Sequence, residues 1–180
     1  MPIVRTVSNK AESMIMPAKS SLISDAIQSQ LPDGYSIRKL QLEDYDKGLL
    51  SNLAQLSTVG DASKAAFEEM FNYMQAHSDT YYPMVVEELA TGNIVGSGTV
   101  FIERKFLHGC GKAAHIEDVV VSSSMRGKSL GKHIIETLKN ISKESGCYKV
   151  ILDCAEHNVA FYEKCGFSMK GSQMACYFDH

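Results

Sequence analysis

The 180-residue sequence lacks the patterns that usually mark a metal site, a membrane span or a disulfide-rich secreted protein. Its five cysteines include no CxxC pair, and its six histidines show no HxxxH or HExxH spacing. No apolar run approaches the roughly 20 residues that cross a bilayer. These absences predict free thiols in a reducing compartment, no metal site and no transmembrane segment.

The charged residues show no strong bias of sign either. Eighteen Lys and Arg residues stand against 21 Asp and Glu residues, a net charge of −3. A basic surface for a polyanion is therefore not indicated, and nucleic acid is not an expected partner. The first residues, MPIVRTVSNK, lack the apolar centre of a secretory signal. We expect a cytoplasmic protein, with import into an organelle through the N-terminal extension left open.

The pattern along the chain predicts one domain preceded by an extension. Residues 1–30 hold six serines and no sustained apolar period, which is typical of a flexible tail. Pro32-Asp33-Gly34 is a turn signal, and a strand follows it. Because this length suits one core, we divide the chain into an extension, 1–30, and a domain, 31–180. One short amphipathic turn is expected near the end of the extension, at Leu22, Ile23, Ala26 and Ile27.

Apolar periodicity predicts a mixed α/β domain of order β-α-α-β-β-β-α-β-α-β-β. A hairpin turn at 90–93 joins the second and third strands, and 108–112 reads as a loop. Glycines end two of the helices, Gly60 the first and Gly146 the third. The expected helices are 42–56, one around 67–74, 130–145 and 158–164, and the later strands are 81–89, 94–105, 115–122, 148–154 and a final hairpin within 166–178.

The segment RGKSLGKH, residues 126–133, has the composition of a phosphate-binding loop. A strand, a loop of small residues and a helix N-terminus together point several N–H groups at one spot. Gly127 and Gly131 allow close approach of a ligand, while neighbouring Arg and Lys side chains supply positive charge. The embedded GKS is not a nucleotide P-loop, because that motif needs glycine where Ser122 stands.

The wider segment HIEDVVVSSSMRGKSLGKHIIETLKN resembles the acetyl-CoA site of the GCN5-related N-acetyltransferase (GNAT) superfamily. In that superfamily, the loop [QR]-x-x-G-x-[GA] between a strand and a helix holds the CoA pyrophosphate. Arg126 and Gly131 match the loop, whereas Ser129 stands where the motif has glycine. We expect some loss of backbone freedom at that position.

Further segments extend the resemblance from about residue 31 to residue 167. LPDGYSIRKL, LSTVG, NIVGSGTVFIERKFLHGCGKAAHIEDVVV, GCYKVILDC and NVAFYEKCGF, in this order, look like the eukaryotic glucosamine 6-phosphate N-acetyltransferase family. The resemblance implies a single GNAT-type acyl-CoA N-acyltransferase domain of α/β class. Its central sheet would be mixed and mostly antiparallel, with helices on both faces.

The resemblance also implies an activity. Acetyl-CoA, without a metal, would donate its acetyl group to the 2-amino group of D-glucosamine 6-phosphate by direct attack in a ternary complex. The products, N-acetyl-D-glucosamine 6-phosphate and CoA, would place the enzyme in UDP-GlcNAc biosynthesis. Members of this family are usually homodimers whose substrate pockets are completed across the interface. Three alternatives stay open: a GNAT enzyme for another amine such as a different amino sugar or a polyamine, a non-catalytic CoA-binding sensor, and a phosphate-ligand binding module.

Residue roles follow from the same resemblance. Catalysis is expected of Glu117, as acceptor of the ammonium proton, of Asp153, and of Tyr162, as donor to the leaving sulfur. The residues expected to hold CoA are Val119, Val120, Val121, Arg126, Gly127, Lys128, Ser129, Leu130, Gly131, Lys132, Asn158, Tyr162 and Lys164. Those expected to hold the amino sugar are Ser57, Thr58, Lys105, His108, Glu117, Asp118, Tyr148, Lys149 and Asp153.

Local spacing gives independent expectations for several of these residues. Consecutive positions on a strand should point Glu117 and Asp118 to opposite faces, so they should not form a paired carboxylate dyad. Asp153 follows a strand, where α/β sheets commonly place ligands. Asn158 and Tyr162 are four residues apart and should share one helix face.

The C-terminus departs from the family pattern. Relatives often carry an arginine there that binds the 6-phosphate, whereas this chain ends QMACYFDH and has Tyr177 at about that position. Either another cation takes its place or the affinity for the 6-phosphate is reduced. Because this arginine is missing, an acceptor amine other than glucosamine 6-phosphate stays a possible substrate.

Overall fold

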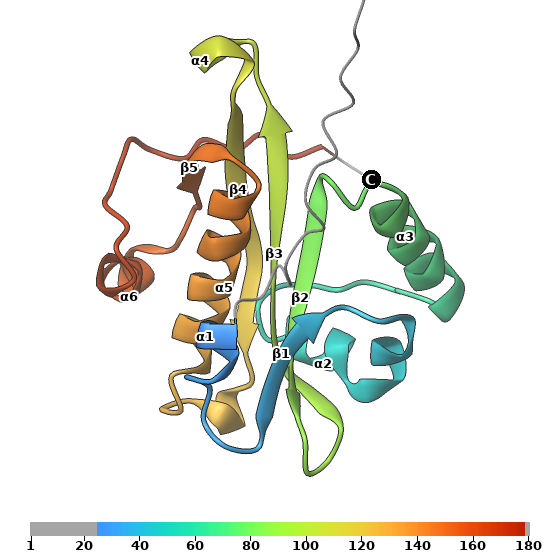
Figure 1. Cartoon of the computed structure of the whole chain (residues 1–180). Helices are drawn as coiled ribbons and strands as arrows, with labels where there is room; N and C mark the ends of the chain where they lie inside the picture. Colours follow the sequence, from blue (N-terminus) through green and yellow to red (C-terminus); the bar gives the residue numbers. More distant parts are fainter. Residues whose placement is uncertain (1–24, 179–180) are drawn as a thin grey trace, which may run out of the picture.

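The computed structural model describes residues 25–178 and contains one five-stranded sheet of order β1-β2-β3-β4-β5 (Figure 1). Strands β1 to β4 are antiparallel neighbours, whereas β4 and β5 run parallel. The predicted fold class, a mixed and mostly antiparallel sheet, is therefore confirmed. The strands are β1 (Tyr35–Lys39), β2 (Tyr81–Glu88), β3 (Asn93–Arg104), β4 (Lys112–Val121) and β5 (Cys147–Ile151).

Helices cover both faces of this sheet, with α5 on one side and α2 and α3 on the other (Figure 1). Helix α1 contacts α5, so the chain from Asp25 onward packs against the domain. Leu22 and Ile23, expected in the same turn, lie outside the described residues. The helices are α1 (Asp25–Gln28), α2 (Leu49–Leu53), α3 (Lys64–Ala76), α4 (Leu107–Cys110), α5 (Leu130–Glu144) and α6 (Val159–Lys164), with 3₁₀ turns at Leu42–Lys47, Ser123–Met125 and Glu156–Asn158.

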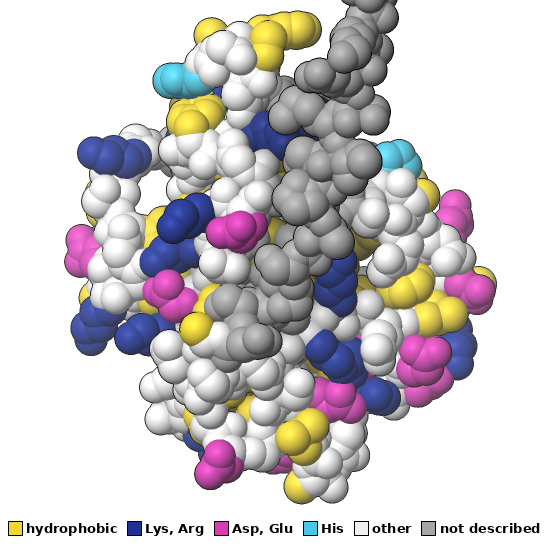
Figure 2. All heavy atoms as spheres, viewed as in Figure 1, with side chains coloured by type: hydrophobic (Ala, Val, Ile, Leu, Met, Phe, Trp, Pro, Cys, Tyr) yellow, Lys and Arg dark blue, Asp and Glu magenta, His cyan; other side chains and the backbone are white. Residues whose placement is uncertain are grey.

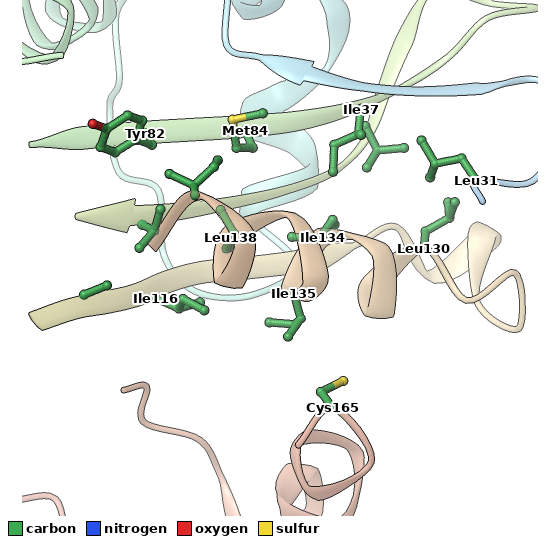
Figure 3. Close-up of a cluster of buried hydrophobic side chains, with 14 of the residues drawn as sticks. Leu31, Ile37, Tyr82, Met84, Ile116, Leu130, Ile134, Ile135, Leu138 and Cys165 are labelled. Atoms are coloured by element: carbon green, nitrogen blue, oxygen red, sulfur yellow. The ribbon is translucent and has the colours of Figure 1, made fainter. Parts of the chain in front are cut away.

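The main core lies between α5 and the sheet. The apolar side chains of α5, spaced three and four residues apart, are at most 1% exposed and face strand residues such as Met84 and Ile116 (Figure 3). Each fully buried aliphatic side chain contributes about 1.5–3 kcal/mol. The five from α5 thus hold the helix, and the glycine loop before it, against the sheet: Leu130, Ile134, Ile135, Leu138 and Ile141.

The helix expected over 42–56 is wrong in detail, because Gly48 divides it. Gly48 adopts φ 84°, and a 3₁₀ turn ends there before α2 begins. The turn is anchored by Asp44, which is fully buried and accepts hydrogen bonds of 2.7 and 2.8 Å from the guanidinium of Arg38. This bidentate ion pair raises the pKa of Arg38. The ion pair of Arg38 and Asp44 therefore fixes a 3₁₀ turn where the spacing of the apolar residues had predicted an α-helix.

The final hairpin expected within 166–178 is also wrong. In the described part of the chain no strand follows β5, and the tail is extended, with Met174 94% and Tyr177 93% exposed. A hairpin gains stability by packing an apolar face, and among residues 25–178 these side chains pack on no such surface. Strand β5 is consequently an edge strand, paired only with β4.

Candidate active site

A cleft opens where β4 and β5 separate. Their parallel pairing ends at His115 and Ile151, while β4 continues to Val121 paired with β3 on its other side. A cleft of about 900 Å³ lies beyond that point. Its lining joins the second half of β4, the loop before α5, the chain after β5 and helix α6, and includes Glu117, Val119, Val120, Val121, Arg126, Gly127, Ser129, Leu130, Gly131, Lys132, Asp153, Asn158, Tyr162 and Lys164.

A β-bulge shapes the wall of the cleft on β4. Asp118 adopts φ +54°, and Asp118 and Val119 together face a single β3 residue, Gly98. A bulge breaks the strict alternation of a strand. The expectation that Glu117 and Asp118 point to opposite faces assumed regular strand geometry, which the bulge interrupts at this place. Both residues keep part of their surface open to solvent, and of the two only Glu117 lines the cleft.

Two further carboxylates, Asp118 and Asp153, lie close enough to Glu117 to act on its charge. Partial burial, followed by the charges of Asp118 and Asp153, raises the pKa of Glu117 above its ordinary value. A carboxylate with a raised pKa is a better proton acceptor near neutral pH than an unperturbed one. The structure thus brings Glu117 and Asp153 together although 35 residues separate them in sequence. Asp153 also accepts a hydrogen bond of 3.2 Å from Gln173 in the C-terminal tail.

Tyr162 lies on α6 and is half-buried in the opposite wall. Its ring packs edge-on against Phe161, with 5.0 Å between centroids, and against Phe167, with 6.1 Å. Burial, then the proximity of Cys154 and Cys165, raises the pKa of Tyr162. The phenol therefore keeps its proton at neutral pH and is a hydrogen-bond donor inside the cleft.

The glycine loop closes one end of the cleft as a cradle of N–H groups. The first intrahelical bond of α5 is donated by His133 N–H to Ser129 O, so the three preceding N–H groups are not used within the helix. Ser129 is the N-cap and adopts φ +60°, a conformation that favours glycine. A methyl group at Gly131 would lie 3.4 Å from Phe161 Cζ, so this glycine lets α6 pack closely.

Positive charge accompanies these donors. Arg126, Lys132 and Lys164 line the cleft, and Figure 2 shows Lys and Arg side chains gathered over α5 and α6. Lys128, expected beside them, does not line it: its ammonium group donates to the Tyr35 hydroxyl and lies 5.0 Å from the centre of that ring. The side chain of Lys128 is thereby directed to β1.

Most residues expected to hold the amino sugar lie outside this cleft. The rings of His108 and Tyr148 contact each other at the end of the sheet that carries α4, with centroids 4.0 Å apart. Lys149 lies over the Tyr148 ring at 5.8 Å, and Lys105 is paired with Glu103. His108, Tyr148 and Lys149 thus form a second cluster, and neither they nor Lys105 line the cleft.

Ser57 and Thr58 stand in the exposed loop after α2. Gln55 and Leu56, directly before them, do line the cleft, and the Gln55 side chain accepts a hydrogen bond of 2.9 Å from Ser123 N–H. This contact joins the loop to the end of β4.

Sequence reasoning missed several lining residues. Cys154 and Ala155 directly follow Asp153, so proximity in sequence could have indicated them. The others are ordinary core or surface types with no distinguishing pattern: Gln55, Leu56, Ile116, Met125, His157, Phe161 and Cys165. Between residues 25 and 178, no cluster of three or more His, Cys, Asp or Glu side chains is arranged to hold a metal ion. None of the helices in that range is long and apolar enough to cross a membrane.

Comparison with known proteins identifies close relatives of the whole domain. Residues 38–167 match the model of the Acetyltransferase (GNAT) family. Glucosamine 6-phosphate N-acetyltransferase of Candida albicans is 46% identical over 148 residues, which cover 82% of this chain and 99% of that protein. The Arabidopsis thaliana protein of the same name is 47% identical over 149 residues, covering 83% of this chain and all of the relative.

Solved structures agree. The crystal structure of glucosamine-6-phosphate N-acetyltransferase from Arabidopsis thaliana superposes with a TM-score of 0.79 at 48% identity, covering 81% of this chain and 99% of that one. An acetyltransferase from Trypanosoma brucei superposes with a TM-score of 0.74 at 36% identity, covering 80% and 99%. The likeness therefore extends over about four fifths of the chain.

Proposed function

This chain belongs to the GNAT acetyltransferase family, and from that premise we propose that it transfers the acetyl group of acetyl-CoA to the 2-amino group of D-glucosamine 6-phosphate. The products are N-acetyl-D-glucosamine 6-phosphate and CoA, which supply UDP-GlcNAc biosynthesis. The observation that carries the proposal is the cleft between β4 and α6. It holds a carboxylate with a raised pKa, Glu117, opposite a phenol that keeps its proton, Tyr162.

The residues of the cleft fit a ligand with the chemistry of acetyl-CoA. The loop from Arg126 to Lys132 offers helix N-terminal N–H groups and cations, which suit a pyrophosphate. Val119–Val121 has no β5 partner, so its backbone is available to pair with an extended pantetheine arm, as a sheet edge pairs with an added strand. Asn158 and Lys164 on the opposite wall supply further polar contacts.

Glu117 performs the first proton transfer. A protonated amine has no lone pair with which to attack, so the ammonium must lose a proton before acetyl transfer. The Glu117 carboxylate accepts that proton, directly or through water, and Asp153 holds the amino group beside it. The neutral amine then attacks the thioester carbonyl in a ternary complex. No cysteine nucleophile is needed.

Val119 and Tyr162 stabilise the charges that develop next. The Val119 N–H donates to the carbonyl oxygen as negative charge builds on it. As the C–N bond forms and the C–S bond breaks, the Tyr162 hydroxyl donates to the leaving sulfur. Burial of Tyr162 favours this role, because it disfavours the phenolate before the transfer.

The variant Tyr162→Phe tests the role of the hydroxyl. It keeps the ring contacts with Phe161 and Phe167 but removes the donor, so we expect kcat to fall about 100-fold or more, in the range of one acid–base group. The affinity for acetyl-CoA should change little. Steady-state kinetics and calorimetric binding of acetyl-CoA measure the two quantities, and wild-type turnover would remove the proposed acid role.

The substrate assignment is tested by release of the CoA thiol from acetyl-CoA with three amines in parallel: glucosamine 6-phosphate, glucosamine and spermidine. We expect the highest kcat/KM with glucosamine 6-phosphate. Equal or higher turnover of the unphosphorylated sugar or the polyamine would contradict the assignment and favour a GNAT enzyme for another amine. Binding of CoA without turnover of any amine would favour a sensor.

The assembly proposed for the enzyme is a homodimer. Two features support it: β5 is an edge strand, and the tail after it exposes Met174 and Tyr177. The cluster of His108, Tyr148 and Lys149 also stands apart from the cleft. A second copy that covers β5 would bury the exposed side chains and bring an additional set of cations to each cleft.

We place the enzyme in the cytoplasm. The exposed thiols of Cys110, Cys154 and Cys176 are those of a protein kept in reducing conditions. Fluorescence microscopy of the full-length chain, tagged at its C-terminus so that the N-terminal extension is free, tests this location against an organelle.

A further inference from the structure

One face of the sheet carries a histidine–carboxylate pair next to Glu117. His115 and Glu117 are two positions apart on β4, and their β3 partners are Phe101 and Thr99. This ladder is regular up to Glu117, before the bulge, so the two side chains share a face. The buried Ile116 between them points into the core on the other face.

His115 is held in a defined orientation. Its Nε2 lies 2.9 Å from Glu103 Oε2, and its ring is stacked on Phe101 with centroids 4.6 Å apart and an angle of 11°. Hydrogen bonds from Lys105 and then from His115 lower the pKa of Glu103, which is therefore a carboxylate that accepts. In the neutral imidazole of His115 the proton is therefore on Nε2, and the lone pair that can accept a proton is on Nδ1.

The reaction creates a need for such an acceptor. Starting from the ammonium form, the acceptor nitrogen loses two protons in each turnover: one passes to Glu117, and the other replaces the proton that Tyr162 gives to the sulfur. The N–C bond and the thiol S–H bond form as the C–S bond breaks. One proton in excess stays on Glu117, and it must leave before the next cycle.

We propose that His115, oriented by Glu103, accepts this proton from Glu117 and passes it to solvent. The O–H bond of Glu117 breaks and an N–H bond forms on Nδ1 of His115; the resulting imidazolium is stabilised by the Glu103 carboxylate and then releases a proton to water. The Cα atoms of residues two apart on a strand are about 6.6 Å apart and their side chains share a face, so the proton would pass through a water molecule between the two groups. The inference depends on the proposed acetyltransferase function and adds a proton acceptor to it.

Chemical rescue tests the proposal. In His115→Ala, we expect kcat to fall about 10-fold or more, with the Kd of acetyl-CoA unchanged, and added imidazole to restore turnover in proportion to its concentration. Imidazole should not stimulate the wild type or Tyr162→Phe. The variant His115→Gln, whose amide donates to Glu103 but is not a base, should lose as much turnover as His115→Ala. It serves as the folded comparison if the alanine variant is unstable.

Either of two results would overturn the proposal: wild-type kcat in a folded His115→Gln variant, or a loss in His115→Ala that imidazole leaves unchanged. All variants are compared with the amine that the wild type acetylates fastest. If glucosamine 6-phosphate is not the substrate, the assay uses another amine, but the comparison of the His115 variants with the wild type is unchanged. Failure of the substrate assignment can therefore be told apart from failure of the His115 proposal.

Discussion

At the scale of single residues, the charges near Glu117 connect the β-bulge on β4 with the proposed proton acceptor. The bulge places Asp118 beside Glu117, and the turn after β5 brings Asp153 to the same carboxylate. Both charges oppose ionisation of Glu117, and partial burial has the larger effect in the same direction. The carboxylate form, which accepts the proton, is fully present only above this raised pKa.

The sign of this shift predicts the pH profile. As pH rises through the raised pKa of Glu117, kcat/KM should rise, so the acidic limb should lie above the ordinary glutamate value of 4.5. In Asp118→Asn one opposing charge is lost and the limb should move to lower pH. Asparagine tolerates the φ of +54° at this position, so the bulge should persist.

Profiles of kcat/KM against pH for the wild type and Asp118→Asn measure this movement. Asp61→Asn, in the exposed loop before α3, is the matched control and should leave the limb in place. A limb that stays fixed in Asp118→Asn would show that Asp118 does not act on the proton acceptor.

Ser129 provides a second prediction at this scale. A side chain at φ +60° costs about 1–2 kcal/mol compared with the right-handed region, a cost that glycine does not have. Ser129→Gly should therefore raise the melting temperature by about 2–4 °C, the shift typical of 1 kcal/mol in a domain of this size. Thermal unfolding measures it, and Gly127→Ala, at φ +85°, should lower the melting temperature instead.

At the scale of elements, the close approach of α5 to β3 positions the glycine loop. A methyl group added at Gly98 would lie 2.8 Å from Ile134 Cγ2 and 3.0 Å from Leu138 Cδ1. Gly98 is also the single β3 residue opposite the bulge. One small residue thus permits both the packing of α5 and the distortion of β4.

Gly98→Ala should accordingly destabilise the protein by about 1–3 kcal/mol, the usual cost of overpacking a core. It should also weaken acetyl-CoA binding, because α5 must move and its N-terminus forms the cradle. Denaturant unfolding and calorimetry measure the two effects. Asn93→Ala, at the exposed start of the same strand, should change stability by less than about 0.5 kcal/mol; a similar loss in both variants would contradict the packing argument.

At the scale of the whole molecule, the residues expected to hold the amino sugar lie in two separate places: Glu117 and Asp153 in the cleft, and the cluster of His108, Tyr148 and Lys149 outside it. This separation predicts an active site to which two copies of the chain contribute. Sedimentation should give twice the 19.8 kDa mass of one chain. Glu117→Gln and Lys149→Ala should each be inactive alone. If each cleft uses Lys149 of the second copy, one of the two sites in a heterodimer of these variants is intact. Because about half of randomly formed dimers are mixed, the refolded mixture should recover roughly a quarter of wild-type activity.

Co-refolding the two variants in equal amounts and assaying the mixture measures this recovery. Each variant refolded alone is the control. A mixture no more active than its components would show that each cleft is complete within its own chain, whatever the mass in solution.

Much of the fold was predictable from the sequence, because regularly spaced apolar residues and turn residues specify helices, strands and hairpins locally. The period of α5, its end near Gly146 and the hairpin at 90–93 are properties of neighbouring residues, and the structure forms them at those places. The loop directly before α5 was predictable for the same reason, while its role as a phosphate cradle stays a prediction. The prediction of one helix over 42–56 was wrong, because Gly48 and the ion pair of Asp44 with the distant Arg38 outweigh the helical spacing of the apolar residues.

By itself the sequence determined the class of fold, the loop between β4 and α5, and the family, since each depends on residues adjacent in the chain. Only the tertiary structure decided the bulge at Asp118, the separation of β4 from β5, and the meeting of Glu117, Asp153 and Tyr162. It also directed Lys128 toward Tyr35 and kept Lys149 apart from the cleft. These outcomes depend on pairing and packing between distant segments, and no local pattern specifies which segments will meet.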